Sequence, residues 1–312
     1  MSDQTIVAEP GSSVAQGHRF GGSTLLGDYW ALTKPEVNFL ILITTLVGFY
    51  LGCGSEARPF SFISLFNTLL GTLLVASGTG TLNQYIEREF DAQMRRTARR
   101  PLAAGRLKPP TVLAFGIALA AIGSSYLAAS VNLLASMLAV LTLLTYLFLY
   151  TPLKRRTPLC VLVGAFPGAM PPLIGWAAAS GGLNTEAWTL YAIVFLWQFP
   201  HFMAIAWMYR EDYDRAGYLV LPKGNARIPF VALETLLPLL ALVAISMAPL
   251  PTQHAATFYC AGALLGLGFL YFGLTFVLQR SRSAARRLLA ASIVYLPLFF
   301  ALSATLCNRG RS

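Results

Sequence analysis

Long apolar segments alternate with short polar ones along most of the chain. Nine of the apolar segments are long enough, at about 17–25 residues, to cross a bilayer as helices. The third and fourth are separated by almost nothing around Val131, which predicts a tight hairpin. The pattern therefore predicts an all-α, polytopic membrane protein with about nine transmembrane helices around a central cavity. The expected spans lie near residues 37–54, 63–83, 111–130, 132–150, 158–179, 187–208, 228–248, 257–279 and 287–306.

Prolines inside these segments predict kinks or broken turns. Such breaks are tolerated in a membrane where neighbouring helices or a cavity satisfy the freed backbone groups. These prolines include Pro167, Pro171, Pro172, Pro200 and Pro297.

The first 28 residues differ from the rest of the chain because they are polar and rich in Gly, Ser and Gln. They lack the basic start, apolar run and small-residue cleavage site of a signal peptide. We expect a disordered polar tail at residues 1–28, followed by one nine-helix transmembrane domain at residues 29–308.

The charge content supports this interpretation. Charged residues make up 12% of the chain, whereas a soluble domain has about 25%. If nine spans are correct, 20 of the 23 basic residues fall on one side, and only Arg58, Arg309 and Arg311 lie opposite. Basic residues favour the cytoplasmic side, so the N-terminus is predicted to be cytoplasmic. The net charge of +10 therefore reflects membrane topology, and no nucleic-acid partner is expected.

The first of two acidic clusters follows the second span. If that span continues as a helix, Asn83, Glu87 and Asp91 stand at positions i, i+4 and i+8 and share one face. One amide and two carboxylates offer hard oxygen ligands, which suit Mg²⁺ bound together with substrate phosphates. Forked donors suited to phosphate oxygens follow at Arg95, Arg96, Arg99 and Arg100.

The second acidic cluster, Glu211, Asp212 and Asp214, follows the sixth span on the same side. One cluster alone fits a solvated helix end as well as a site, but two of the same composition favour a shared site. His201 precedes this cluster and is expected deeper in the membrane, where a core residue, a proton relay and a porphyrin contact all remain open. The aromatic residues nearby, which fit either packing or the lining of an apolar pocket, are Trp197, Phe199, Phe202 and Trp207.

Four stretches carry a family pattern. They are Asn83-x-x-x-Glu87-x-x-x-Asp91, Arg96-Thr97-x-x-Arg100-Pro101-Leu102, Tyr150-Thr151-Pro-Leu-Lys154-Arg155-Arg156-Thr157, and His201-Phe202 through Arg210-Glu211-Asp212-Tyr213 to Ala216-Gly217. Together they resemble the UbiA superfamily of intramembrane prenyltransferases over roughly residues 28–306, and within it the branch that farnesylates protohaem. The chain departs from the wider superfamily at Glu87, where many relatives have Asp, and at Ala216, where a second Asp usually follows Asp212. The second departure favours the haem branch.

The resemblance implies Mg²⁺-dependent transfer of a farnesyl group from farnesyl diphosphate to a vinyl group of haem B, giving haem O for terminal oxidases. For this activity we expect catalytic and metal-binding roles for Asn83, Glu87, Asp91 and Asp212. The residues expected to bind the diphosphate are Arg95, Arg96, Arg100, Lys154 and Arg210. Those expected in a haem pocket are His201, Trp207 and Arg155.

The same resemblance implies a bacterial cytoplasmic (inner) membrane location, with the active site at the cytoplasmic side. The expected partners are membrane lipid, an isoprenoid diphosphate and haem. Haem A synthase or a terminal oxidase is expected as an assembly partner.

Two alternatives remain open from the residues. A secondary transporter is the first, and the repetition of acidic clusters after spans two and six is consistent with its internal symmetry. However, the acids lie at one edge and most span centres are neutral, which argues against ion coupling. The second alternative is prenylation of an aromatic acid or transfer to a chlorophyll-type alcohol, which differs only in the acceptor.

Overall fold

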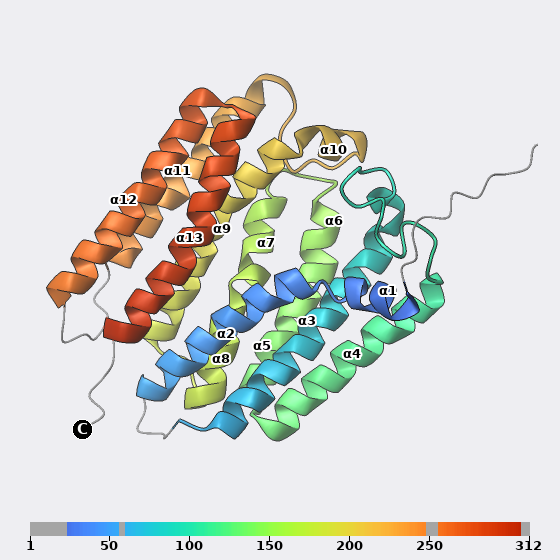
Figure 1. The fold of residues 1–312 in the computed structure, drawn as a ribbon, viewed down its shortest axis with the longest axis horizontal. Helices are drawn as coiled ribbons and strands as arrows, with labels where there is room; N and C mark the ends of the chain where they lie inside the picture. The colour runs from blue at the N-terminus through green and yellow to red at the C-terminus, as the bar shows by residue number, and fades with distance from the viewer. Residues whose placement is uncertain (1–23, 56–59, 248–254, 307–312) are drawn as a thin grey trace, which may run out of the picture.

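The computed structural model describes residues 24–55, 60–247 and 255–306 as a helical bundle, and no strand occurs within these ranges (Figure 1). Nine helical segments of the described chain are long and apolar enough to cross a membrane, so the predicted all-α class and span count are confirmed. The elements are α1 (Leu25–Leu32), α2 (Pro35–Ser55), α3 (Phe62–Asp91), α4 (Pro109–Ser130), α5 (Leu133–Leu144), η1 (Thr145–Tyr150), α6 (Thr151–Leu153), α7 (Cys160–Gly168), α8 (Met170–Ser180), α9 (Thr185–Met208), α10 (Arg210–Arg215), η2 (Gly224–Ala226), α11 (Arg227–Ser246), α12 (Ala255–Gln279) and α13 (Arg282–Leu306).

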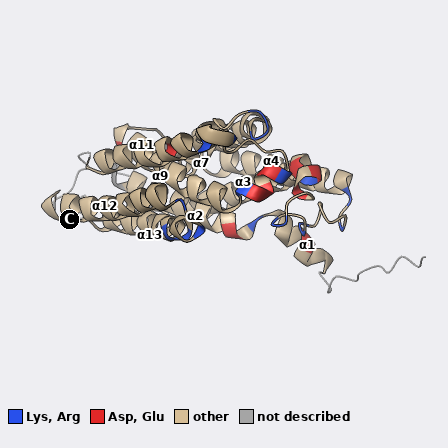
Figure 2. Ribbon diagram, turned by 90° about the horizontal axis from the view of Figure 1, so that it is seen from above, with Lys and Arg blue, Asp and Glu red and all other residues tan. Residues whose placement is uncertain are grey.

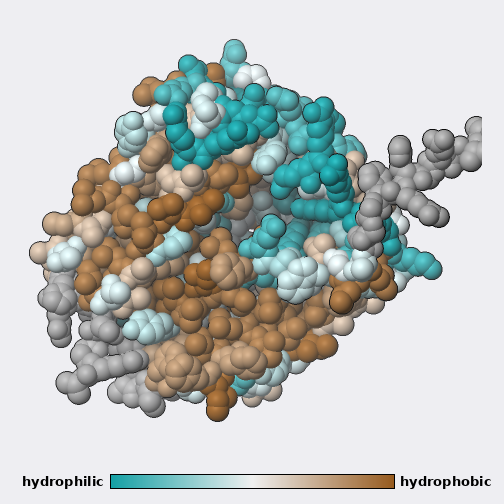
Figure 3. Space-filling view, in the orientation of Figure 1, coloured by the Kyte–Doolittle hydropathy of each residue, from teal (hydrophilic) through white to brown (hydrophobic). Residues whose placement is uncertain are grey.

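The surface divides into an apolar body and one hydrophilic end, below which the face in view is hollowed (Figure 3). The hydrophilic end is made by the connections that we call the polar rim, residues 92–108, 154–159 and 209–226. Acidic and basic side chains gather near the end of α3, while α12 and most of α9 are uncharged (Figure 2). Large apolar side chains such as Phe66, Leu264 and Tyr271 are exposed on the body. A surface of this kind is covered by lipid rather than by water.

Small residues allow the helices to pack closely. A Cβ atom on Gly78 of α3 would lie 2.7 Å from the backbone nitrogen of Ala120 in α4. On the other side of α3, a Cβ atom on Gly175 of α8 would overlap the Thr45 carbonyl of α2. Lipid gives no hydrophobic drive for helix association, so close backbone contact of this kind is a main source of stability in a bilayer.

The prolines of the fifth span break it into two helices. α7 ends at Gly168 and α8 begins at Met170, with two prolines in the first turn of α8. Buried Gln198 of α9 donates a hydrogen bond of 3.1 Å to the Ala165 carbonyl beside the break. The predicted broken turn is therefore confirmed here, whereas α9 and α13 continue as helices through Pro200 and Pro297.

A π-helical segment, η1, interrupts the fourth span immediately before Pro152. Proline has no backbone N–H, so it cannot continue the regular ladder of hydrogen bonds. The Thr151 hydroxyl instead donates to the Tyr146 carbonyl at 2.8 Å. Single π turns are frequent at functional sites, and this one carries Tyr146 and Tyr150, with Thr151 directly after it, toward the polar rim.

The predicted tail boundary at residue 28 is wrong in its last residues. α1 begins at Leu25, and the Thr24 hydroxyl caps it by accepting from the Gly27 backbone at 3.1 Å. Asp28 is buried and pairs with Arg106 at 3.0 Å, which fixes α1 to the connection between α3 and α4. The rest of the predicted tail, residues 1–23, lies outside the described residues, as do residues 307 and 308 at the predicted end of the domain.

Candidate functional site

A polar stripe on α3 forms the centre of the site. α3 has 30 residues, whereas about 20 suffice to cross the bilayer core, and it continues past the predicted span end at Asn83 as far as Asp91. Asn83, Glu87 and Asp91 therefore share one helical face, as the spacing predicted. Their exposed fractions are 1%, 5% and 1%, so the stripe faces the interior of the protein.

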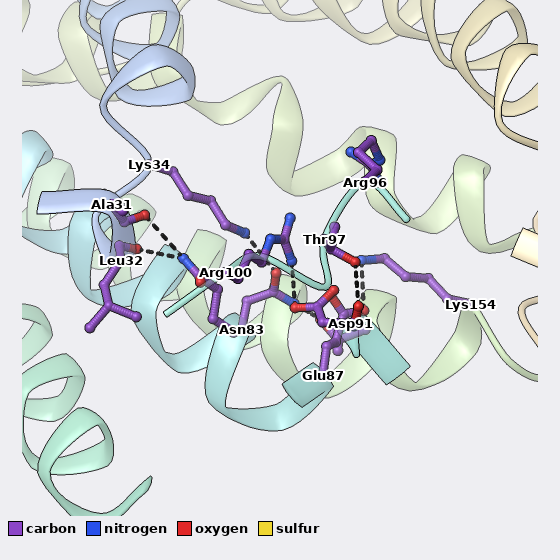
Figure 4. A network of polar contacts seen from close by, with 12 residues as sticks. Ala31, Leu32, Lys34, Asn83, Glu87, Asp91, Arg96, Thr97, Arg100 and Lys154 are labelled. Carbon is purple, nitrogen blue, oxygen red and sulfur yellow. Dashed lines mark hydrogen bonds and ion pairs between the residues drawn. The ribbon is translucent and has the colours of Figure 1, made fainter. Parts of the chain in front are cut away.

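Each residue of the stripe receives a cation from a different part of the chain (Figure 4). Lys34, between α1 and α2, donates to the Asn83 Oδ1 atom at 2.9 Å. Lys154, after α6, donates to Glu87 Oε1 at 2.9 Å. The third cation is Arg100 of the α3–α4 connection, 2.6 Å from the second carboxylate oxygen of the last stripe residue, Oδ2. Lys34 and Lys154 reach the stripe from opposite sides.

Tyrosines complete the surroundings of the Glu87–Lys154 pair. Tyr218, in the α10–η2 connection, donates its hydroxyl to Glu87 Oε1 at 3.1 Å. The Lys154 ammonium lies 4.5 Å from the centre of the Tyr150 ring and 5.9 Å from that of Tyr146. This cation therefore has both a carboxylate and aromatic faces as partners.

Burial and charge shift two basic groups in opposite directions. Burial, followed by the positive charge of Arg100, lowers the pKa of Lys34 to about 7. Burial alone would also lower the pKa of Lys154, but the adjacent Glu87 carboxylate raises it well above its usual value. Burial raises the pKa of the Tyr218 hydroxyl, so it stays a hydrogen-bond donor. At neutral pH, Lys154 is therefore a fixed cation, while the charge of Lys34 depends on what lies beside it.

Arg96 links the two acidic clusters across the polar rim. Its guanidinium lies 5.3 Å from the Tyr209 ring centre and donates to the Tyr213 hydroxyl at 3.5 Å. Asp212, which precedes that tyrosine on α10, pairs with Arg215 of the same helix at 3.0 Å. The structure thus brings the second cluster to the rim through Arg96, and it shows no contact between Asp212 and the stripe.

The other predicted diphosphate ligands have different surroundings. Arg95 is exposed on the rim. Arg210 donates to the carbonyl of Trp207 at 2.8 Å and lies 3.7 Å from Glu211, so its described contacts stay within its own segment. Arg155, predicted for the haem pocket, stacks on the Phe90 ring of α3 at 4.1 Å.

The other two residues predicted for the haem pocket pack against neighbouring helices. His201 stacks on Trp197 with ring centres 4.6 Å apart, and its Nδ1 atom is 2.8 Å from the Ser292 hydroxyl of α13. Trp207 donates its indole N–H to the Arg280 carbonyl at 3.2 Å and packs against α12. His201 is half-buried, whereas Trp207 is a buried packing residue between α9 and α12.

The stripe fits a hard cation in chemistry, although its acids are few. Within the described ranges, no three His, Cys, Asp or Glu side chains lie close enough together to form a metal site by themselves. The Asp91 Oδ1 atom, however, is buried and has no hydrogen-bond partner. Such an orphaned carboxylate oxygen needs an explanation, and with the oxygens of Asn83 and Glu87 on the same face it matches the ligands that Mg²⁺ prefers.

The sequence did not identify Lys34, Thr151 or Tyr218 as site residues. Lys34 counted only as a cytoplasmic charge before the first span. Thr151 accepts a hydrogen bond of 3.2 Å from Asn83 Nδ2, and Tyr218 is separated from Glu87 by 131 positions. For Thr151 and Tyr218, their places in the family stretches, inside one and just after another, are the only signals the sequence contained.

Comparison with known proteins identifies relatives that cover most of the chain. The pattern of the UbiA prenyltransferase family matches residues 25–303. A protein of Solibacter usitatus named protoheme IX farnesyltransferase is 48% identical over 282 residues, which cover 88% of this chain and 97% of that protein. A mitochondrial protein of the same name from Arabidopsis thaliana is 38% identical, over 87% of this chain and 63% of the relative.

Solved structures show the same fold at low sequence identity. A structure described as digeranylgeranylglyceryl phosphate synthase in membranes superimposes with a TM-score of 0.70 at 17% identity, covering 91% of this chain and 98% of that chain. A UbiA homolog from Archaeoglobus fulgidus bound to GPP and Mg²⁺ gives a TM-score of 0.60 at 15% identity, covering 88% and 99%.

Proposed function

Because this chain belongs to the UbiA prenyltransferase family, we propose that it transfers a farnesyl group from farnesyl diphosphate to a vinyl group of haem B with the help of Mg²⁺. The observation that carries this proposal is the 48% identity, over nearly its whole length, to a relative named for that reaction. The buried stripe of oxygen ligands, surrounded by cations, supports the diphosphate half of the reaction. The Archaeoglobus homolog, bound to a prenyl diphosphate and Mg²⁺, supports the metal.

In this proposal the α3 stripe binds the metal and the surrounding cations bind the diphosphate. Asn83, Glu87 and Asp91 hold Mg²⁺, and Asp212 is the candidate for a ligand from the second cluster. Bound Mg²⁺ neutralises charge on the leaving diphosphate. The cations that share this charge are Arg95, Arg96, Arg100, Lys154 and Arg210, of which Lys154 and Arg100 already lie against the stripe.

The apolar bundle below the stripe suits the chemistry of the transferred group. The bond between the farnesyl carbon and the diphosphate oxygen breaks, and the allylic carbon forms a new bond to the terminal vinyl carbon of haem B. Water then adds to the other vinyl carbon and loses a proton, which leaves a hydroxyl group. A dry cavity protects the farnesyl carbocation, which forms when the diphosphate leaves, from water until the acceptor has reacted.

For the acceptor side we propose His201 and Arg155 as haem contacts. His201 is half-buried with one ring nitrogen hydrogen-bonded to Ser292, and Arg155 is an exposed residue of the rim whose guanidinium suits a propionate. Trp207 is the weakest member of the predicted pocket because its described contacts are those of packing. We also propose that the protein lies in a bacterial inner membrane with its polar rim on the cytoplasmic side. Haem A synthase or a terminal oxidase is the proposed assembly partner.

A product assay tests the proposal directly. Purified protein in detergent is incubated with haem B, farnesyl diphosphate and Mg²⁺, with and without chelator, and the porphyrin is followed by mass. A gain of one farnesyl group and one hydroxyl group that requires Mg²⁺ supports the proposal. Loss of product in correctly inserted Glu87→Gln and Asp91→Asn variants would tie the metal to the stripe, and full activity in both would refute that assignment.

The same assay separates the alternatives. Mg²⁺-dependent diphosphate release with an aromatic acid, and none with haem B, would keep the stripe assignment and change the acceptor. No diphosphate release from folded protein, together with solute uptake into liposomes, would support a transporter instead.

A further inference from the structure

Lys34 has an unusual backbone conformation at an important point of the site. Its φ angle is +53°, in the left-handed region, and among the described residues other than glycine only Arg280 shares this property. A side chain at such an angle is strained, and strain of this kind persists where the surroundings hold it and is frequent at functional sites. Glycine would adopt the same turn without strain, so the turn itself gives no reason for a lysine.

The segment that carries Lys34 is fixed to α3. Gln84 of α3 donates to the carbonyls of Ala31 at 3.3 Å and Leu32 at 3.0 Å. Asn38 of α2 donates to the Thr33 carbonyl at 2.8 Å and to the Ser77 hydroxyl of α3 at 2.9 Å. These contacts fix the backbone on both sides of Lys34, so its side chain is directed at the stripe (Figure 4).

The charge of Lys34 exceeds what the stripe requires. Glu87 is paired with Lys154, and Asp91 is paired with Arg100. The partner of Lys34 is a neutral amide oxygen, Asn83 Oδ1. The stripe and its contacts therefore contain two carboxylates and three cations, and the cation without a carboxylate partner is the one on the strained turn. A site with such an excess of positive charge is suited to an anionic ligand.

Asn83 Oδ1 cannot accept the hydrogen bond from Lys34 and bind a metal ion at the same time. Mg²⁺ binds its oxygen ligands at about 2.1 Å, so an ammonium 2.9 Å from the same atom would be pushed away by the metal's charge. We propose that Lys34 occupies Asn83 Oδ1 in the free protein and moves onto the diphosphate when metal and diphosphate bind together. Lys34 is then a diphosphate ligand that also keeps bare metal out. This inference rests on the diphosphate chemistry proposed above but not on haem as the acceptor.

The test measures binding in the full-length protein and needs no acceptor. Lys34→Met removes the charge, Lys34→Gly also removes the strain, and Lys34→Arg keeps the charge. Lys223→Met is the matched control, since Lys223 is an exposed lysine of the polar rim. Calorimetry measures the affinity of each variant for Mn²⁺ alone and for inorganic pyrophosphate with Mg²⁺, and farnesol binding with thermal melting checks the fold.

We expect opposite changes for the two probes. Lys34→Met and Lys34→Gly weaken pyrophosphate binding about tenfold or more, which is the effect of losing one charge-assisted contact, and both bind Mn²⁺ alone more tightly than the wild type. Lys34→Arg and Lys223→Met keep pyrophosphate affinity within about twofold. General damage to the protein would weaken both probes together, so the opposite signs identify the role of the cation.

Two results would overturn the inference alone. One is unchanged pyrophosphate binding in Lys34→Met and Lys34→Gly. The other is Mn²⁺ binding that weakens in parallel with pyrophosphate binding. Absence of pyrophosphate binding in the wild-type protein would instead refute the proposed prenyl-diphosphate function, and this inference with it.

Discussion

The two partners of the Glu87–Lys154 ion pair should lower the stability of the protein by different amounts when each is removed. Their side chains are 7% and 13% exposed and their charged atoms lie 2.9 Å apart, so the pair is largely removed from solvent. Breaking a buried ion pair by removing one partner costs about 3–5 kcal/mol because the other charge is left buried. The loss of stability in each variant depends on which partners remain beside the charge that is left, and it can fall within that range or below it.

Lys154→Met leaves the Glu87 carboxylate with one short-range donor, the Tyr218 hydroxyl at 3.1 Å. We therefore expect a loss of about 3 kcal/mol for this variant. Glu87→Gln leaves the Lys154 ammonium over the Tyr150 ring at 4.5 Å, a contact worth about 2 kcal/mol when shielded from water. The expected loss for Glu87→Gln is accordingly only about 1–2 kcal/mol. The double variant has no unpaired charge and should be more stable than Lys154→Met by about 2 kcal/mol.

Thermal melting of the purified proteins in detergent measures these differences. At about 2–4 °C for each kcal/mol, Lys154→Met should melt on the order of 6–12 °C below the wild type, and the double variant should recover about two thirds of that. Lys223→Met, an exposed lysine on the same rim, serves as the control and should not shift the midpoint. Glu87→Gln melting at or below Lys154→Met would refute the assignment of the tyrosines as partners of the cation. A double variant no more stable than Lys154→Met would refute the cost assigned to the unpaired Glu87 carboxylate.

Three further predictions follow from other contacts. Gly78→Val should destabilise the α3–α4 pair by about 1–3 kcal/mol, because a Cβ atom at this position would lie 2.7 Å from the Ala120 nitrogen. The control variant Gly182→Ala has open space around its Cβ atom and should melt like the wild type. Equal melting midpoints for the two variants would contradict this packing. Arg96→Ala should weaken the binding of pyrophosphate with Mg²⁺ severalfold, as measured by calorimetry. Because Arg96 is exposed, its loss should leave the melting temperature nearly unchanged. A large drop in stability would show a structural role instead. Trp207→Phe loses the hydrogen bond to the Arg280 carbonyl, so the protein should lose about 1 kcal/mol of stability. The KM for haem B should not change. A raised KM at unchanged stability would instead support Trp207 as a haem-pocket residue.

The sequence alone determined the spans and the stripe because both depend on local properties. The length of an apolar segment decides whether a helix crosses a bilayer, and no distant residue changes that length. The spacing of Asn83, Glu87 and Asp91 places them on one face of any helix that contains them, and α3 extends to Asp91 as this required. The family stretches likewise lie within short windows of the chain, so the amino-acid order by itself is enough to indicate the family.

Only the tertiary structure decided which cations serve the stripe. Lys34 and Lys154 reach it across 49 and 67 positions, and several other basic residues follow each span at the same side. Which of them arrives depends on the packing of α1, the π turn before Lys154 and the path of the α3–α4 connection. The sequence also assigned residues 24–28 to a polar tail, because the burial of Asp28 against Arg106 depends on a contact across 78 positions. Contacts of this range are set by the arrangement of the helices, which periodicity and composition do not encode.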